Sequence, residues 1–199
     1  MSSIYTKILS LNDLAEIQKL VEERTRFLNQ HNSHESDLAY IRGIESLLRN
    51  HTQSFQLMGA FQSDTKNLVC FAGAYEHTST PTWSLLYVNN TINELGANNP
   101  LNILLESFLN YFESKGIYRF IYACPFRGKS VYQRDNFNSL LTRLCPSLNR
   151  YHFFTSEVIE PNGRSNYEIH RLLLGPISSK AKMVVRHAEL DEKYRSNLD

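Results

Sequence analysis

The stretch INELGANNPLN, from Ile92 to Asn102, decides the fold because it joins two different kinds of sequence. Before it, TWSLLYVNN (82–90) is rich in the aromatic and aliphatic residues that favour a β-strand. After it, ILLESFLNYFESKG (103–116) carries apolar residues at the spacing of an amphipathic helix. The Gly, Ala, Asn and Pro residues between the two runs allow two interpretations. One is a turn with a well-capped helix, and the other is a row of accessible backbone N–H groups for an anionic ligand.

The helix that follows this stretch has clear start and stop signals. Asn99 is a favourable N-cap, Pro100 suits the first helical position, and Gly116 is the residue expected just after the C-terminal end. The next run, IYRFIYACP (117–125), is almost entirely apolar or aromatic, as a strand covered on both faces should be. Strand, helix and strand in this order predict a β-α-β crossover whose two strands, 82–90 and 117–125, run parallel.

The residues upstream predict a strand, two helices and an antiparallel meander. IYTKILS (4–10) favours a strand, and the segment Ser10-Leu-Asn-Asp13 has the form of a capping box that opens a helix. A polar loop, NQHNSHES (29–36), leads to a second helix. Short turn-forming links then separate strand-like runs, which predicts antiparallel pairing of neighbours; these runs are 54–62, 67–78 and 82–90.

The residues downstream predict a further helix and a hairpin. SVYQRDNFNSLLTRLCPSL (130–148) favours a helix that is ended by Pro146. Two strands, 150–161 and 167–175, should form a hairpin around NGRS, and 182–190 is expected to be a final strand. We therefore expect one α/β domain with a mixed sheet over residues 1–190, followed by a polar tail at 191–199.

The composition is that of a globular protein, with 42% hydrophobic and 21% charged residues. No apolar run is long enough to span a membrane, and the first residues contain no apolar signal segment, so we expect a cytoplasmic protein. The three isolated cysteines, Cys70, Cys124 and Cys145, are expected to be reduced and buried. The motif His31-x-x-His34-Glu35 has no clear third ligand, so we predict no metal site.

Positive charge is concentrated between Lys115 and Arg150, where seven Lys and Arg residues accompany a single acidic residue, Asp135. This segment could attract a phosphate-bearing ligand, or it could be an ordinary solvated face. Aromatic residues alternate with the basic ones, but core packing of a strand explains Tyr118, Phe120 and Tyr122 better than base stacking does. With a net charge of only +1, the chain is not expected to bind nucleic acid.

The order of elements resembles that of the GNAT superfamily, the N-acetyltransferases that move an acyl group from coenzyme A to an amine. The resemblance covers nearly the whole chain in element order and rests on partial motifs. It implies a GNAT-like fold in which the two parallel strands splay apart, with acetyl-CoA or another acyl-CoA in the gap and its pyrophosphate on the loop before the crossover helix. The loop pattern of the family is Gln/Arg-x-x-Gly-x-Gly/Ala. In residues 93–98 Gly96 agrees, whereas Asn93 and Asn98 depart.

The resemblance also assigns roles to individual residues. Pyrophosphate is expected at the loop and helix start, with basic side chains near the phosphates and the open backbone of the strand before the loop polarising the acyl carbonyl. The residues expected to bind the acyl donor are Leu86, Tyr87, Val88, Gly96, Ala97, Asn98, Asn99, Arg127 and Lys129.

A second family pattern, Asn-x-x-Ala-x-x-Leu-Tyr-x-x-x-Gly-Phe, agrees here at Tyr132 and Phe137 and departs at Pro125 and Asn136. By resemblance, Tyr132 is the candidate general acid that protonates the leaving thiolate, since a phenol stays protonated at neutral pH. The strand TWSLLYVNN carries no carboxylate. The proton of the amine would then go to Glu76, to Glu157 or to an ordered water.

Two functions from different classes follow. The first is an N-acyltransferase that passes an acetyl or acyl group directly from acyl-coenzyme A to a primary amine on a small molecule or peptide. The second is a GNAT-like binding or regulatory domain without catalysis, which the departures in the loop and the missing base favour. No membrane partner is expected, and a homodimer is an open alternative.

Overall fold

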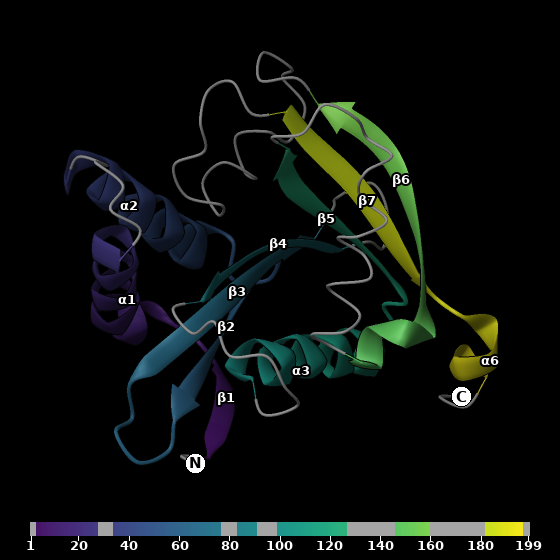
Figure 1. The fold of residues 1–199 in the computed structure, drawn as a ribbon, viewed down its shortest axis with the longest axis horizontal. Coiled ribbons are helices and arrows are strands. Elements are labelled where there is room, and N and C mark those ends of the chain that lie inside the picture. Colours follow the sequence, from purple (N-terminus) through teal and green to yellow (C-terminus); the bar gives the residue numbers. More distant parts are fainter. Residues whose placement is uncertain are drawn as a thin grey trace.

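The computed structural model describes residues 3–27, 34–76, 83–90, 99–126, 146–159 and 182–196, and nothing is stated about the structure of the others. For residues 24–27, 34–37, 83–90, 122–126, 155–159 and 182–186 the description concerns the backbone. The described strands form one seven-stranded sheet in the order β1-β2-β3-β4-β5-β7-β6 (Figure 1).

Strands β2, β3 and β4 form the predicted antiparallel meander, and β1 pairs antiparallel with β2, although two helices separate β1 from β2 in the chain. Helix α2 begins at His34, so the last three residues predicted as polar loop are helical. The bounds in chain order are β1 Ile4–Ile8, the 3₁₀ turn η1 Leu11–Asp13, α1 Leu14–Phe27, α2 His34–Asn50, β2 Phe55–Gln62, β3 Leu68–Glu76 and β4 Trp83–Asn90.

The second half of the chain contains the crossover helix and the remaining strands. The strand β6 pairs antiparallel with β7, which runs alongside β5. The predicted hairpin turn and second hairpin strand lie outside the described residues, as does the predicted helix up to residue 145. The bounds are α3 Pro100–Ser114, β5 Arg119–Phe126, the 3₁₀ helix η3 Pro146–Arg150, β6 Tyr151–Ile159, β7 Lys182–Leu190 and α6 Glu192–Arg195.

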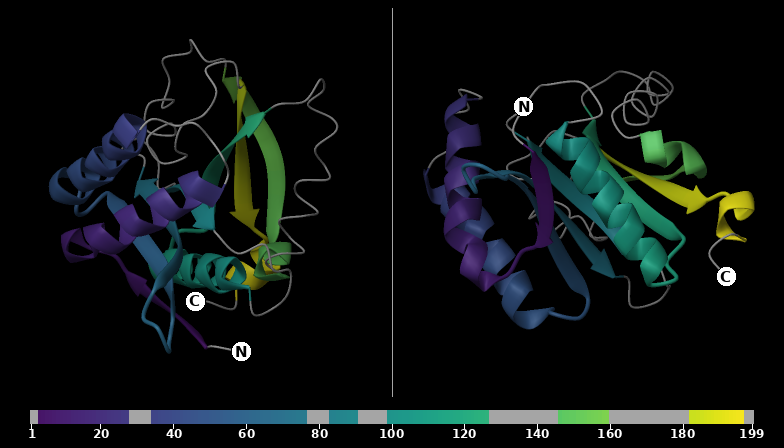
Figure 2. Two further views of the ribbon diagram at one scale, coloured as in Figure 1. Left: turned by 60° about the vertical axis from the view of Figure 1, so that its left-hand side comes forward. Right: turned by 90° about the horizontal axis from the view of Figure 1, so that it is seen from below.

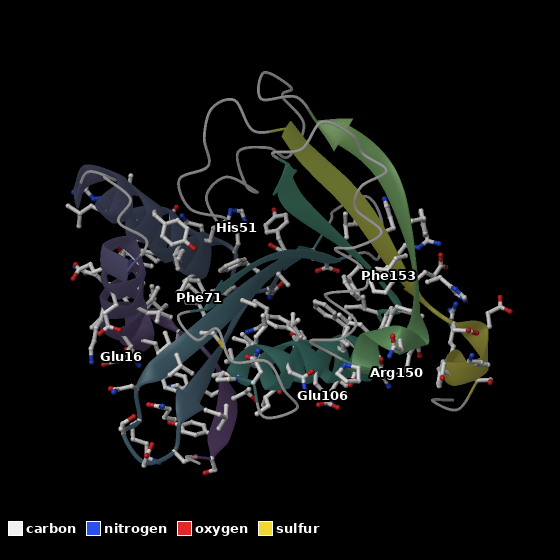
Figure 3. All side chains as sticks on the ribbon, in the orientation of Figure 1. Glu16, His51, Phe71, Glu106, Arg150 and Phe153 are labelled. Atoms are coloured by element: carbon white, nitrogen blue, oxygen red, sulfur yellow. The ribbon has the colours of Figure 1, made fainter. Side chains whose placement is uncertain are left out.

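Helices cover both faces of the meander, and alternation along the strands sends side chains to two separate cores (Figure 2). In β2, Met58 and Ala60 face α3, whereas Phe55 and Leu57 face α1 and α2. Phe71 points from β3 toward the same pair of helices (Figure 3). Because the pattern has a period of two residues, any one-residue slip would exchange the two cores.

The core on the α3 face extends across the crossover into the second half of the sheet. It joins Leu104, Leu105 and Phe108 of α3 to Phe120 of β5 and Ala188 of β7. The predicted packing role of Phe120 is therefore confirmed, since only 2% of this residue is exposed. Cys70 is buried in the same core, and burial raises the pKa of its thiol to about 12, as expected of an inert reduced cysteine.

The predicted stop of the crossover helix is confirmed by its geometry. Gly116 has φ +70°, the left-handed conformation that glycine adopts without a Cβ penalty after a helix end. The chain then enters β5, which pairs in parallel with β4 and antiparallel with β7. The expected parallel arrangement around the crossover is thus present. None of the described helices is both long and apolar enough to cross a membrane.

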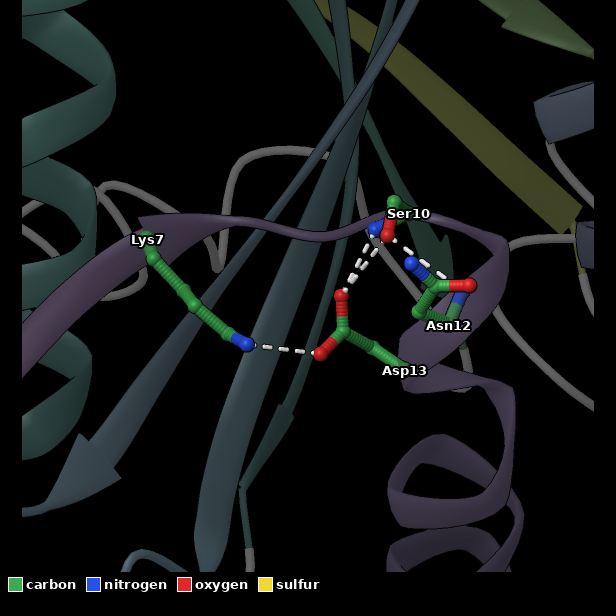
Figure 4. Close-up of polar contacts among 4 residues, drawn as sticks. All are labelled: Lys7, Ser10, Asn12 and Asp13. Carbon is green, nitrogen blue, oxygen red and sulfur yellow. Dashed lines mark hydrogen bonds and ion pairs between the residues drawn. The ribbon is translucent and has the colours of Figure 1, made fainter.

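The predicted capping box connects β1 to the first helical segment (Figure 4). The carboxylate of Asp13 accepts from the backbone N–H of Ser10 at 2.9 Å, and the Ser10 hydroxyl accepts from the N–H of Asn12 at 3.3 Å. Lys7 of β1 donates to the other carboxylate oxygen of Asp13 at 2.7 Å. Partial burial raises the pKa of Asp13, but the contacts with Lys7 and Ser10 outweigh it, so the pKa lies below its usual range.

We expect Asp13→Asn to lower the free energy of unfolding by about 0.5–1 kcal/mol, because it removes the charged member of this box. A depressed folded-state pKa contributes stability above the unfolded value of about 4, and this contribution is lost as the pH falls through the folded value. Urea denaturation at pH 7 and at pH 3 measures both effects. Glu45→Gln, which loses an exposed ion pair with Arg49 and no cap, is the control. An equal loss for Asp13→Asn at both pH values would contradict this account.

Candidate functional site

The candidate site lies where β4 and β5 separate. Their parallel register joins Trp83 to Phe120, Ser84 to Ile121 and Leu85 to Tyr122, and there it ends. Both strands continue beyond these pairs, β4 to Asn90 and β5 to Phe126. In Figure 1 β5 runs to the upper part of the view, away from α3, whereas β4 runs back alongside β3, so the two strands diverge. We call the diverging parts of β4 and β5 the fork.

Each strand of the fork remains paired to its outer neighbour. Strand β5 pairs with β7 along all of its residues, and β4 stays in register with β3 to its last residue, Asn90. The separation is therefore confined to the inner edges, where the backbone groups of the two strands no longer meet. The resemblance to the GNAT superfamily implies that these two strands splay apart, and their shared register ends at Leu85.

A bulge in β4 coincides with the point of separation. The register between β3 and β4 passes from Ala74↔Leu85 to Gly73↔Tyr87, so Leu86 is opposite no residue of β3. Since the pairing with β5 stops at Leu85, Leu86 also has no register partner there. Bulges re-aim the backbone, and they are over-represented beside active sites. Leu86 is therefore the residue of β4 that has no register partner on either side at the point of separation.

The other two strand residues predicted for the site keep their places in the sheet. Tyr87 is opposite Gly73 and Val88 is opposite Ala72 in the antiparallel pairing with β3. The sequence predicts an open backbone at Leu86, Tyr87 and Val88 alike. It could not single out Leu86, because a one-residue bulge depends on the partner strand rather than on local propensity.

The start of α3 is fixed by its cap. Asn99 is 4% exposed, and its side-chain oxygen accepts from the N–H of Leu101 at 2.9 Å. Pro100 has no N–H to offer, and the N–H of Ile103 is bonded to the carbonyl of Asn99 at 3.2 Å. The capped-helix interpretation is therefore confirmed for Asn99. The helix still directs the positive end of its dipole at whatever approaches this tip.

A buried polar residue that was not singled out from the sequence lies in the same turn. Asn102 is 6% exposed, and it shares the buried face of α3 with Leu105 and Leu109. Its position in phase with those leucines is the signal that could have identified it, since an amide at a core-facing position of a helix is unusual.

Several predicted site residues lie outside the described part of the chain. These are the loop residues Gly96, Ala97 and Asn98, the basic residues Arg127 and Lys129, and the candidate acid Tyr132. Their roles remain predictions. Glu157 lies in β6 at a register shift opposite β7, in a segment for which the backbone alone is described.

The candidate base Glu76 lies away from the open end of the fork. It is the last residue of β3 and is opposite Trp83, where β4 and β5 are still paired. Its charge lies close to Tyr111 of α3, whose hydroxyl donates to Gln56 at 3.1 Å. Burial is the main cause that raises the pKa of Tyr111, and the Glu76 carboxylate raises it further. Glu76 therefore faces α3 at the closed end of the fork, which argues against its use as the base.

Comparison with solved structures identifies the architecture. A candidate acetyltransferase of the GNAT family from Desulfovibrio desulfuricans superposes with a TM-score of 0.60 and 11% identity, over 95% of this chain and 100% of that one. The chain has the GNAT fold. The resemblance read from the element order is thereby confirmed for the fold, including the meander and the mixed sheet.

Other proteins with the GNAT fold superpose equally well. A spermidine N-acetyltransferase chimera from Vibrio cholerae has a TM-score of 0.59 and 13% identity, over 97% of this chain and 98% of that one. A ribosomal L7/L12 N-terminal protein acetyltransferase in complex with coenzyme A has a TM-score of 0.57 and 11% identity, over 96% and 95%. No protein-family model and no curated protein sequence matches the chain. At these identities the likeness establishes the fold alone.

We expect Asn99→Ala to lower the free energy of unfolding by about 1 kcal/mol, because the N–H of Leu101 would lose its acceptor at a buried helix start. Thermal and urea denaturation without ligand measure the loss. Asn99→Asp retains a side-chain acceptor and should keep most of the stability. A stability of Asn99→Ala equal to that of the native chain would show that the cap bond contributes nothing.

Proposed function

We propose that this chain is an N-acyltransferase that moves an acetyl or other acyl group from acyl-coenzyme A directly to a primary amine. The observation that carries the proposal is the coincidence of two features at Leu86. The β4 bulge leaves this residue opposite no residue of β3, and the pairing of β4 with β5 stops one residue earlier. A backbone N–H held in an open position by a rigid sheet is suited to polarise a carbonyl group.

The chemistry requires few groups from the protein. The lone pair of a neutral amine attacks the thioester carbonyl carbon, the carbonyl oxygen gains negative charge, and the C–S bond then breaks to release the thiolate. The backbone around Leu86 would stabilise the charge on the oxygen, and Tyr132 would give its proton to the thiolate. The amine loses a proton to an ordered water or to Glu157, since Glu76 lies at the closed end of the fork.

The acyl donor would be held at the open end of the fork. Strand β4 ends at Asn90 and α3 begins at Pro100, so Gly96, Ala97 and Asn98 come in the sequence between the fork and a helix N-terminus, where anions are favoured. Asn99 contributes by fixing the start of that helix. In the sequence, Arg127 and Lys129 follow β5, the other strand of the fork, and they would supply positive charge near the phosphates.

The acceptor is a primary amine on a small molecule or a peptide, and we propose that the protein works in the cytoplasm, where acyl-coenzyme A is available. Proteins with this fold include one named for spermidine and one named for a ribosomal protein, so the fold accommodates both classes. A catalytically inactive GNAT-like domain is the competing function, because the loop retains a single residue of the family pattern.

We expect acetyl-coenzyme A to raise the melting temperature of the protein. At a concentration 100 times Kd, binding to the folded state adds about 2.7 kcal/mol, which corresponds to roughly 5–10 °C for a chain of this size. Differential scanning fluorimetry with acetyl-coenzyme A, and with acetate as a control, measures the shift. No shift at millimolar acetyl-coenzyme A would contradict the proposal and favour the inactive domain.

We expect Tyr132→Phe to reduce turnover about 10²-fold or more while leaving the shift in melting temperature intact, because it removes the proton donor and keeps the ring. Release of free thiol with a panel of amines reports turnover. Tyr194→Phe, at a partly exposed tyrosine of α6, is the matched control. Loss of the thermal shift in Tyr132→Phe would mean that this residue binds the donor rather than acting as the acid.

A further inference from the structure

Helix α3 connects the two parts of the sheet that meet at the fork, and we call these parts the arms. The first arm consists of β1 to β4, and the second consists of β5, β7 and β6 with η3. On the first arm, Ser107 of α3 shares a hydrogen bond with Thr6 at 3.0 Å, and Tyr111 donates to Gln56 at 3.1 Å. On the second arm, the ring of Phe112 packs on Phe120 with centroids 6.1 Å apart. The sheet joins the arms through the three residue pairs between β4 and β5, which we call the junction. Helix α3 is therefore the other major link between the arms.

The last turn of α3 holds the second arm through a buried carboxylate. The side chain of Glu113 is 7% exposed. One of its oxygens accepts from the Tyr151 hydroxyl at 2.8 Å and lies 3.0 Å from the Arg150 guanidinium, and the other accepts from Arg150 at 3.4 Å. We call Glu113, Arg150 and Tyr151 the clasp, and Figure 3 shows Arg150 beside the C-terminal part of α3. Hydrogen bonds to an ionised group are stronger than neutral ones, and burial strengthens them further.

The clasp is continuous with the strands that it holds. The ring of Tyr151 packs edge-on against Phe120 of β5, with centroids 5.3 Å apart. The carbonyl of Arg150 accepts from the N–H of Asp191 at 2.9 Å, just after β7 ends. All three strands of the second arm are therefore tied, directly or through one neighbour, to the carboxylate of Glu113.

We propose that Glu113 and Tyr151 are positioning residues that set the spacing of the fork and thereby the binding of the acyl donor. This inference rests on the proposed function, since it assigns the fork to acyl-coenzyme A. The clasp lies at the closed end, near the N-terminus of β5, and the donor would lie at the open end. A small rotation about the three-residue junction is therefore amplified toward the site. Displacements of about 1 Å at a reacting group can cost 10²-fold in rate.

The test compares Tyr151→Phe with Ser147→Ala. Tyr151→Phe removes the hydroxyl from Glu113 and keeps the ring on Phe120. Ser147→Ala removes an exposed bond from the neighbouring η3 residue to Glu106 of the same helix, at 3.0 Å, and leaves the clasp intact. Glu113→Gln is the second variant, which keeps an acceptor for Tyr151 and loses the charge that faces Arg150.

Hydrogen–deuterium exchange without ligand measures the junction itself. We expect Tyr151→Phe to speed exchange in peptides that cover 83–85 and 120–122, with exchange in β2 and β3 unchanged.

Calorimetry then compares the binding of coenzyme A, which would reach between the arms, with that of adenosine 3′,5′-bisphosphate, which would occupy the helix tip alone. Coenzyme A should bind about tenfold more weakly to the variant, and the bisphosphate should bind as before. Ser147→Ala should change none of these.

Two results would overturn the positioning role. One is faster exchange confined to 146–155 and the end of α3, with the junction unaffected. The other is an equal change, or no change, for the two nucleotides. Failure of the native chain to bind coenzyme A would refute the proposed function instead, and the exchange at the junction would still decide whether the clasp sets the arms.

Discussion

The junction, which is the parallel pairing of β4 with β5, is three residues long, and the remainder of the structure depends on this short seam between the two strands. A longer seam would close the sheet and leave no space between the strands. Without a seam, the two arms would have no common reference. The bulge at Leu86 ends it, because an extra residue turns the inner edge of β4 away while its outer edge stays paired with β3.

A seam this short cannot hold two arms at a fixed angle, so packing must supply the rest. Helix α3 does so because its buried face is wide enough to cover β2 and β3 and also Phe120 of β5. The polar contacts lie at the two margins of that face, Thr6 and Gln56 on one side and Arg150 and Tyr151 on the other. Apolar burial gives the helix its affinity for the sheet, whereas these directional bonds fix where it lies.

The sequence predicted the parts of this arrangement that depend on local chemistry. The cap at Asn99, the stop at Gly116 and the box formed by Ser10 and Asp13 are all present, because each needs only residues within one turn. The bulge at Leu86 could not be predicted, since it is defined by β3. The bonds of Glu113 to Tyr151, 38 residues away, give no local signal either. The resemblance to the GNAT superfamily therefore predicted the fork, but not what limits or holds it.

The start of α3 shows how binding energy would be divided within the site. Pro100 lacks an N–H, and those of Leu101 and Ile103 are bonded to Asn99, so these three residues leave the helix dipole as their contribution to an anion at this tip. A dipole contributes about 0.3–1 kcal/mol at an exposed site. That is small beside a micromolar affinity, which corresponds to about 8 kcal/mol. Most of the affinity for an acyl donor would then have to come from direct contacts rather than from the dipole. The spacing of the fork would matter to binding because it decides which of the contacts between the strands can form.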